Sequence, residues 1–112
     1  MRFALVLLPL GVALCPPALA HDAASGWQYE AFCCNGNSHN GDCQLIPSEK
    51  VRIIAGGYRI TLAPADHRLA TRNHTFHFAQ DAARRSEDGE YHLCLYPDEN
   101  TPRCFYAPDL GF

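Results

Sequence analysis

The chain has 112 residues, of which 47% are hydrophobic and 19% charged, and a formal net charge of −3 at pH 7. This length fits one domain, and a domain this small buries a modest fraction of its surface. The 9 Lys and Arg residues are scattered among 12 Asp and Glu residues. Because nucleic-acid binding needs clustered positive charge to release counterions from phosphates, nucleic acid is not an expected partner.

The first twenty residues have the layout of a secretory signal peptide. Arg2 gives a positive start, an apolar run follows, and Ala18-Leu19-Ala20 places small residues before a cleavage point. The apolar run is shorter than the roughly 20 residues that a spanning helix needs. We therefore expect a signal peptide at residues 1–20 and a mature chain of residues 21–112, periplasmic or secreted, with no membrane insertion after cleavage. Loss of Arg2 alone makes its net charge −4.

The mature chain begins with an alternating stretch, residues 26–32 (GWQYEAF), which predicts a short strand. It leads into FCCNGNSHNGDC, residues 32–43, which holds three cysteines and one histidine. Asn, Gly and Ser dominate the second half of this stretch and favour turns, so we expect the cysteine cluster to lie in a loop.

Residues 51–62 (VRIIAGGYRITL) predict a β-hairpin. With Gly56-Gly57 as a two-residue turn, Ile53 lies opposite Ile60 and one face of the hairpin is apolar. The alternating segment 74–78 (HTFHF) predicts another strand.

The C-terminal third predicts about two helical turns at residues 79–86 and then a strand after an Asp88-Gly89 turn. If residues 97–101 form the loop of a second hairpin, Tyr96 pairs with Pro102 and Cys94 lies opposite Cys104. Pro102 then belongs to an edge strand or a strand start, because proline cannot donate to a ladder. The predicted fold is a mainly β domain, with small α+β possible, in which antiparallel hairpins are held by disulfides.

Five cysteines remain after removal of the signal peptide, and export leads to an oxidising compartment in which disulfides persist. An odd number allows at most two bridges within the chain and leaves one thiol. The hairpin register allows a Cys94–Cys104 bond, but either residue could instead reach back to the first cluster. The disulfide candidates are Cys33, Cys34, Cys43, Cys94 and Cys104.

Two other chemistries fit the cysteines less well. The spacing does not match the C-x2-4-C pairs of zinc sites, although a copper or zinc site that uses His39, His92 and Cys43 remains an alternative. A thiol-redox function would normally use a C-x-x-C motif, which the sequence lacks.

No motif of nucleophilic or metal-dependent catalysis is present, so we expect no enzyme and no cofactor. We expect instead a module that binds an unidentified protein or small ligand. Its predicted surface lies on the cysteine-bearing face of the last hairpin, where aromatic rings lie beside charge. The candidate residues are Tyr96, Tyr106, His92 and Arg103.

The order of motifs resembles a group of small exported cysteine-rich proteins, mainly alphaproteobacterial, of unassigned function. The shared pattern is CC, then D-C, then S-x-D-G-x-Y-H-x-C, then R-C-[FY]-x-A-P, and it spans most of the mature chain. The matching residues are Cys33, Cys34, Asp42, Cys43, Ser86, Asp88, Gly89, His92, Cys94, Arg103 and Cys104. The resemblance implies a signal peptide and a periplasmic location, and it implies no reaction or ligand. This chain departs from the pattern in its longer, histidine-containing loop NGNSHNGD.

Overall fold

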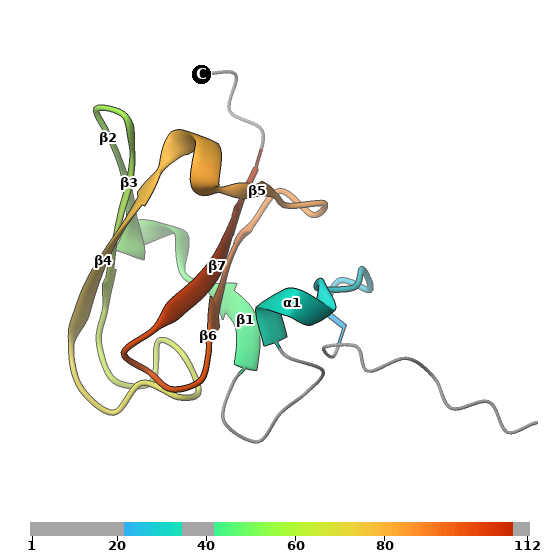
Figure 1. Cartoon of the computed structure of the whole chain (residues 1–112), viewed down its shortest axis with the longest axis horizontal. Helices are drawn as coiled ribbons and strands as arrows, with labels where there is room; N and C mark the ends of the chain where they lie inside the picture. The colour runs from blue at the N-terminus through green and yellow to red at the C-terminus, as the bar shows by residue number, and fades with distance from the viewer. Residues whose placement is uncertain (1–21, 35–41, 109–112) are drawn as a thin grey trace, which may run out of the picture.

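The computed structural model describes residues 22–34 and 42–108. In this part of the chain, seven strands form two sheets (Figure 1). The larger sheet has the order β1 (Asp42–Ile46), β6 (Tyr91–Leu95), β7 (Pro102–Ala107) and β5 (Arg84–Arg85). The smaller sheet has the order β2 (Val51–Ile54), β3 (Gly57–Leu62) and β4 (His74–Ala79). The predicted mainly β fold is confirmed, and the predicted signal peptide lies outside the described residues.

Three short helices accompany the strands in the described residues: α1 (Ala31–Cys34) and the 3-10 turns η1 (Ser48–Lys50) and η2 (Gln80–Ala82). The two helical turns predicted at residues 79–86 are therefore wrong. That segment forms one 3-10 turn and then β5, which runs parallel to β7. No helix in the described ranges is long and apolar enough to cross a membrane.

The main hydrophobic core lies between the two sheets. Alternation along each strand supplies it, because successive side chains of a strand point to opposite faces. Its buried members are Ile46, Tyr58, Ile60, Leu62, Phe76, Leu93, Leu95, Phe105 and Ala107. The larger sheet thus uses one face of β6 and β7 to cover the smaller sheet.

The second face of the larger sheet is also buried, under residues 22–34, which we call the N-terminal cover. The buried residues of this layer are Ala23, Tyr29, Cys33, Cys43, Cys94, Cys104 and Tyr106, with Trp27 packed against them. The strand predicted at residues 26–32 is wrong, since only Gln28 pairs, with Asp22, and Ala31 already begins α1. The aromatic side chains lie over the sheet instead of extending its edge.

The β2–β3 hairpin forms with the predicted faces but a different register. Ile53 pairs with Tyr58 and Val51 with Ile60, a shift of two residues that leaves every side chain on its expected face. Gly56 has a positive φ of 81° and lies in the turn, whereas Gly57 is the first residue of β3.

The β6–β7 hairpin places Cys94 opposite Cys104, as predicted. A bulge after Cys94 makes Leu95, and not Tyr96, the partner of Pro102. Pro102 is the first residue of β7, so the predicted strand start is confirmed, and β5 pairs only with the other end of β7, at Tyr106 and Ala107.

Candidate binding surface

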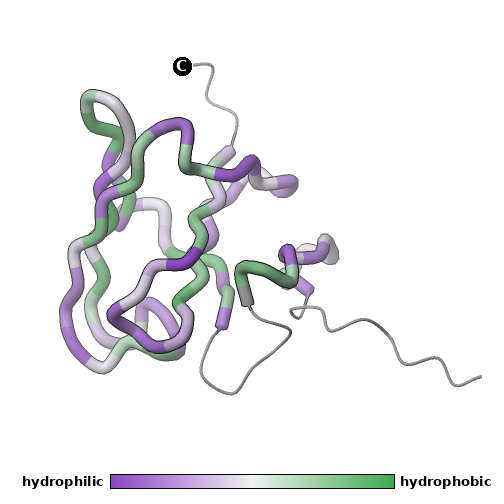
Figure 2. The backbone as a smooth tube through the Cα atoms, in the orientation of Figure 1, coloured by the Kyte–Doolittle hydropathy of each residue, from purple (hydrophilic) through white to green (hydrophobic). Residues whose placement is uncertain are grey.

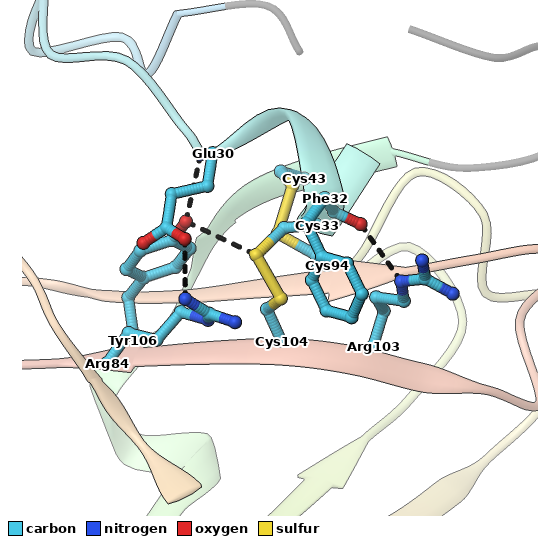
Figure 3. The surroundings of a disulfide bond; sticks show 9 residues. All are labelled: Glu30, Phe32, Cys33, Cys43, Arg84, Cys94, Arg103, Cys104 and Tyr106. Carbon is cyan, nitrogen blue, oxygen red and sulfur yellow. Dashed lines mark hydrogen bonds and ion pairs between the residues drawn. A yellow bond between two sulfur atoms is a disulfide. The ribbon is translucent and has the colours of Figure 1, made fainter. Parts of the chain in front are cut away.

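Two disulfides connect the described cysteines and hold β1 to β6 and α1 to β7. Cys43–Cys94 joins neighbouring strands of the larger sheet, and Cys33–Cys104 joins α1 to β7 (Figure 3). Cys43 therefore lies in a strand, not in the predicted loop. Of the three cysteines of the first cluster, Cys33 and Cys43 are disulfide-bonded, and the side chain of Cys34 lies outside the described residues.

The proposed metal site is not compatible with this pairing. Cys43 is oxidised and cannot act as a thiolate ligand. His39 lies outside the described residues, and both ring nitrogens of His92 already have hydrogen-bond partners. Within residues 22–34 and 42–108, no group of three His, Cys, Asp or Glu side chains could hold a metal ion.

His92 is the centre of a buried hydrogen-bond chain. Its Nδ1 lies 2.7 Å from the hydroxyl of Tyr29, and its Nε2 lies 2.9 Å from both carboxylate oxygens of Asp88. Burial, reinforced by the carboxylates of Asp88 and Asp42, raises the pKa of Tyr29 well above its usual range. Tyr29 is therefore a neutral phenol, and its hydroxyl and the Asp88 carboxylate each hydrogen-bond with one ring nitrogen of His92.

Asp88 connects this chain to two loops. Its carboxylate accepts hydrogen bonds from the hydroxyls of Ser25 and Ser86 and from the amide of Glu90. Burial raises the pKa of Asp88, but the hydrogen bonds from Ser25 and His92 outweigh it, and the net pKa lies well below the usual range.

Tyr29, His92 and Asp88 are hydrogen-bonded in an order that resembles a catalytic relay, but Tyr29, at one end, is buried. Tyr29 is 2% exposed and His92 is 1% exposed. The ring of Trp27 lies edge-on to both, at centroid distances of 5.1 Å. These hydrogen bonds fasten the N-terminal cover to β6 through Tyr29 and His92.

Tyr106 is enclosed by the same cover. Its hydroxyl accepts a hydrogen bond from the amide of Glu30 and donates to Sγ of Cys33 (Figure 3). Tyr106 is only 2% exposed. The expected exposure of Tyr106 and His92 on a binding surface is therefore wrong, because the cover occupies the face of β6 and β7 that carries them.

Tyr96 and Arg103, the other two predicted residues, do lie together, and they gather around Phe32. The guanidinium of Arg103 lies 4.0 Å from the centroid of the Phe32 ring and 5.0 Å from that of Tyr96. Arg84 lies 5.6 Å from the centroid of the Phe32 ring and pairs with Glu30 at 2.5 Å. We call Phe32, Arg103, Tyr96 and Arg84 the Phe32 patch.

Phe32 is 56% exposed, although it belongs to a strongly hydrophobic segment (Figure 2). The backbone of Phe32 is held at two points. The next residue, Cys33, is disulfide-bonded to β7, and the carbonyl of Phe32 accepts a 2.9 Å hydrogen bond from Nε of Arg103 (Figure 3). The sequence held a signal for this exposure. In the alternation of residues 26–32, Phe32 falls on the side of Gln28 and Glu30.

The patch has the composition of a protein-binding site. Aromatic residues and arginine are enriched at the centres of interfaces, where they account for much of the binding energy. The terminal nitrogens of Arg103 have no hydrogen-bond partner among the described residues, so they remain available to an acceptor on a ligand. The chain matches no protein-family model, and comparisons with curated proteins and with solved structures gave no significant match.

Proposed function

We propose that the protein is an exported, non-enzymatic binding module that recognises a partner protein through the Phe32 patch. One observation carries the proposal: Phe32 is an exposed aromatic ring held in place by a disulfide and by Arg103. Burial of such a ring against a partner is favourable, by about 25 cal/mol for each Å² of apolar surface removed from water. Because the backbone that carries the ring is already held, less conformational entropy is lost on binding than for a residue of a free loop.

The patch also defines the chemistry of the partner. Arg103 offers planar donors beside two aromatic faces, and a guanidinium pairs best with a carboxylate. A segment that presents a carboxylate next to an apolar side chain would satisfy both the ring of Phe32 and the guanidinium of Arg103. Arg84 contributes less, since Glu30 already neutralises it.

Two observations support the periplasmic or secreted location that is part of this proposal. The disulfides Cys33–Cys104 and Cys43–Cys94 are of the kind that persists in oxidising compartments. The first twenty residues have the layout of an export signal.

Selection from a displayed library of random peptides tests the function without a known partner. The oxidised mature protein is immobilised, and enriched peptides are measured against Phe32→Ser and Arg103→Gln. We expect enriched peptides with an acidic residue next to an apolar one, and at least tenfold weaker binding to both variants. Leu45→Ser is the matched control, because Leu45 is also an exposed apolar residue (43%) but lies outside the patch.

Two results would contradict the proposal. One is a set of selected peptides that bind Phe32→Ser and the original protein equally well. The other is equal loss of binding in Leu45→Ser, which would indicate nonspecific hydrophobic attachment. Intact-mass measurement of each variant, with and without reduction, verifies that the disulfides have formed.

A further inference from the structure

The outer face of the smaller sheet carries a row of two arginines and one histidine that the Phe32 patch does not include. Arg52 on β2 pairs with Arg59 on β3, and Arg59 pairs with His77 on β4. Directly opposed residues point to the same face of a sheet, so the three side chains are neighbours. Arg52 and His77 are exposed and Arg59 is half-buried. We call them the Arg52–Arg59–His77 row.

The residues beside this row are neutral. Two residues further along β3, on the same face, Thr61 lies opposite Thr75 of β4, and both are exposed. On the other side, Ile54, Gly57 and Ala79 are aligned across the three strands. The part of this face formed by β2, β3 and β4 therefore offers two guanidiniums, one imidazole and two hydroxyls, and no carboxylate.

The arginines also lack carboxylate partners from elsewhere. Neither Arg52 nor Arg59 forms an ion pair or a side-chain hydrogen bond with a residue in the described ranges, whereas Arg68 and Arg84 each pair with a carboxylate. Like charges directly opposite each other destabilise a sheet. The two opposed arginines therefore repel each other without an ion-paired carboxylate among the described residues.

We propose that the Arg52–Arg59–His77 row binds the phosphate or sulfate group of a small ligand. Opposed side chains start about 5 Å apart, which lets one tetrahedral oxyanion accept hydrogen bonds from both guanidiniums. His77 and the two threonines add donors at the margins of the site. A row across three strands spans only about 10 Å, which fits one anionic group and is short for the backbone of a polyanion.

Titration with inorganic phosphate tests this site directly. Backbone amide NMR spectra of the oxidised mature protein are recorded at constant ionic strength, with chloride replaced by phosphate. We expect saturable shifts confined to the strands that carry the row. Arg52→Thr and Arg59→Thr should each weaken phosphate binding at least tenfold. Arg85→Thr is the matched control, because Arg85 is an exposed strand arginine of the other sheet and should leave the affinity unchanged.

A stability measurement provides a second readout. At low ionic strength without phosphate, Arg52→Thr should raise the urea midpoint, because it removes the repulsion from Arg59. With phosphate present, the original protein should gain more stability than the variant, because a ligand that binds the folded state stabilises it. A midpoint that is equal in both proteins under both conditions would contradict the proposal.

The remaining outcomes are also decisive. Linear, non-saturating shifts, or equal weakening in Arg85→Thr, would mean that phosphate only screens charge. Binding to vesicles of phosphatidylglycerol and phosphatidylcholine with no response to inorganic phosphate would replace the small-ligand site with a membrane surface. Neither result would affect the Phe32 patch, which lies on the other sheet and on α1.

Discussion

Gly56 and Gly57 are adjacent, yet each is required for a different physical reason. Gly56 has a positive φ of 81°, and a Cβ added there would meet no atom within 4 Å, so its role is conformational. A Cβ on Gly57 would lie 2.1 Å from the carbonyl oxygen of Phe78 on β4. Gly57 is therefore needed for the close approach of β3 and β4.

The two glycines give a matched pair of substitutions. Gly57→Ala should lower the free energy of unfolding by about 3 kcal/mol, because the clash is with backbone. Gly56→Ala should cost about 1 kcal/mol, the strain of alanine in a left-handed conformation. Urea unfolding of both variants measures the difference, and equal losses would refute this distinction.

Ala65 is the opposite case, a non-glycine residue with a positive φ of 79°. The amide of Asp66 donates to the carbonyl of Ala63, and the sequence Pro64-Ala65 fits the central positions of a type II turn, where glycine is preferred. We expect Ala65→Gly to stabilise the protein by about 0.5 to 1 kcal/mol, as the released strain exceeds the added entropy of the unfolded chain. A lower urea midpoint than that of the original protein would contradict this expectation.

At the scale of elements, three cysteines lie in one row across three strands. Cys43 on β1 is opposite Cys94 on β6, which is opposite Cys104 on β7. Cys94 thus has a cysteine neighbour on each side. The native pairing uses one neighbour, while Cys104 is bonded to Cys33 of the cover.

This row predicts disulfide exchange when Cys33 is removed. In Cys33→Ser, made in a Cys34→Ser background, the Cys104 thiolate can attack Sγ of Cys94 and release the Cys43 thiolate. We expect a measurable fraction of Cys94–Cys104 bonds with alkylated Cys43, detected by peptide mapping without reduction. If only Cys43–Cys94 is found with alkylated Cys104, the row does not exchange.

The positions of strands could be predicted from the sequence where apolar and polar residues alternate, because that alternation is typical of a strand. The alternation of residues 74–78 and 91–96 predicted β4 and β6 and their faces, because apolar side chains must share one side. The cover was not predictable. Trp27 and Tyr29 alternate in the same way whether they extend a sheet edge or lie over its face, and that choice depends on β6 and β7, more than sixty residues away.

The same limit applied to the candidate site. Tyr96 and Arg103 were predicted and do form part of the Phe32 patch. His92 and Tyr106 also carry polar atoms, but those atoms form hydrogen bonds with Tyr29 and Glu30 of the N-terminal cover. Sequence patterns place a residue on a face of a strand, and they do not show what packs on that face.

At the scale of the whole molecule, several buried or hydrogen-bonded groups couple stability to pH. Hydrogen bonds from His74 and Thr71 lower the pKa of Glu99 to about 2, and the pKa of Asp88 also lies below its usual range. Burial lowers the pKa of His67, whose Nε2 donates to the carbonyl of Leu93.

All three shifts favour the deprotonated group in the folded state, so all three predict lower stability in acid. The contribution of His67 is complete above about pH 6.5 and should decline as the pH falls below that value. The contributions of the two carboxylates are complete above about pH 4.5 and should be lost towards pH 2. Urea midpoints measured from pH 8 to pH 2 check the two stages.

Two substitutions distinguish the loss of stability caused by His67 from the loss caused by the carboxylates. His67→Gln keeps a donor for Leu93 but cannot be protonated, so the decline in stability that begins below about pH 6.5 should be removed. Glu99→Gln should leave that decline intact and reduce the loss below about pH 4.5. An unchanged pH profile in His67→Gln would assign the first stage to another group.

The N-terminal cover has a consequence for how the molecule is made. Cys33 and Cys43 are separated from their partners by 71 and 51 residues, so Cys43 cannot be paired correctly until β6 has been synthesised, and Cys33 cannot until β7 has been. β7 lies in the interior of its sheet, and the surface on which the cover rests does not exist before that strand arrives. The N-terminal cover is thus the last segment to find its place, and oxidation of Cys33 before β7 is complete can join it only to a wrong cysteine. Correct production should therefore depend on a disulfide isomerase, or on oxidation that begins after the chain is complete.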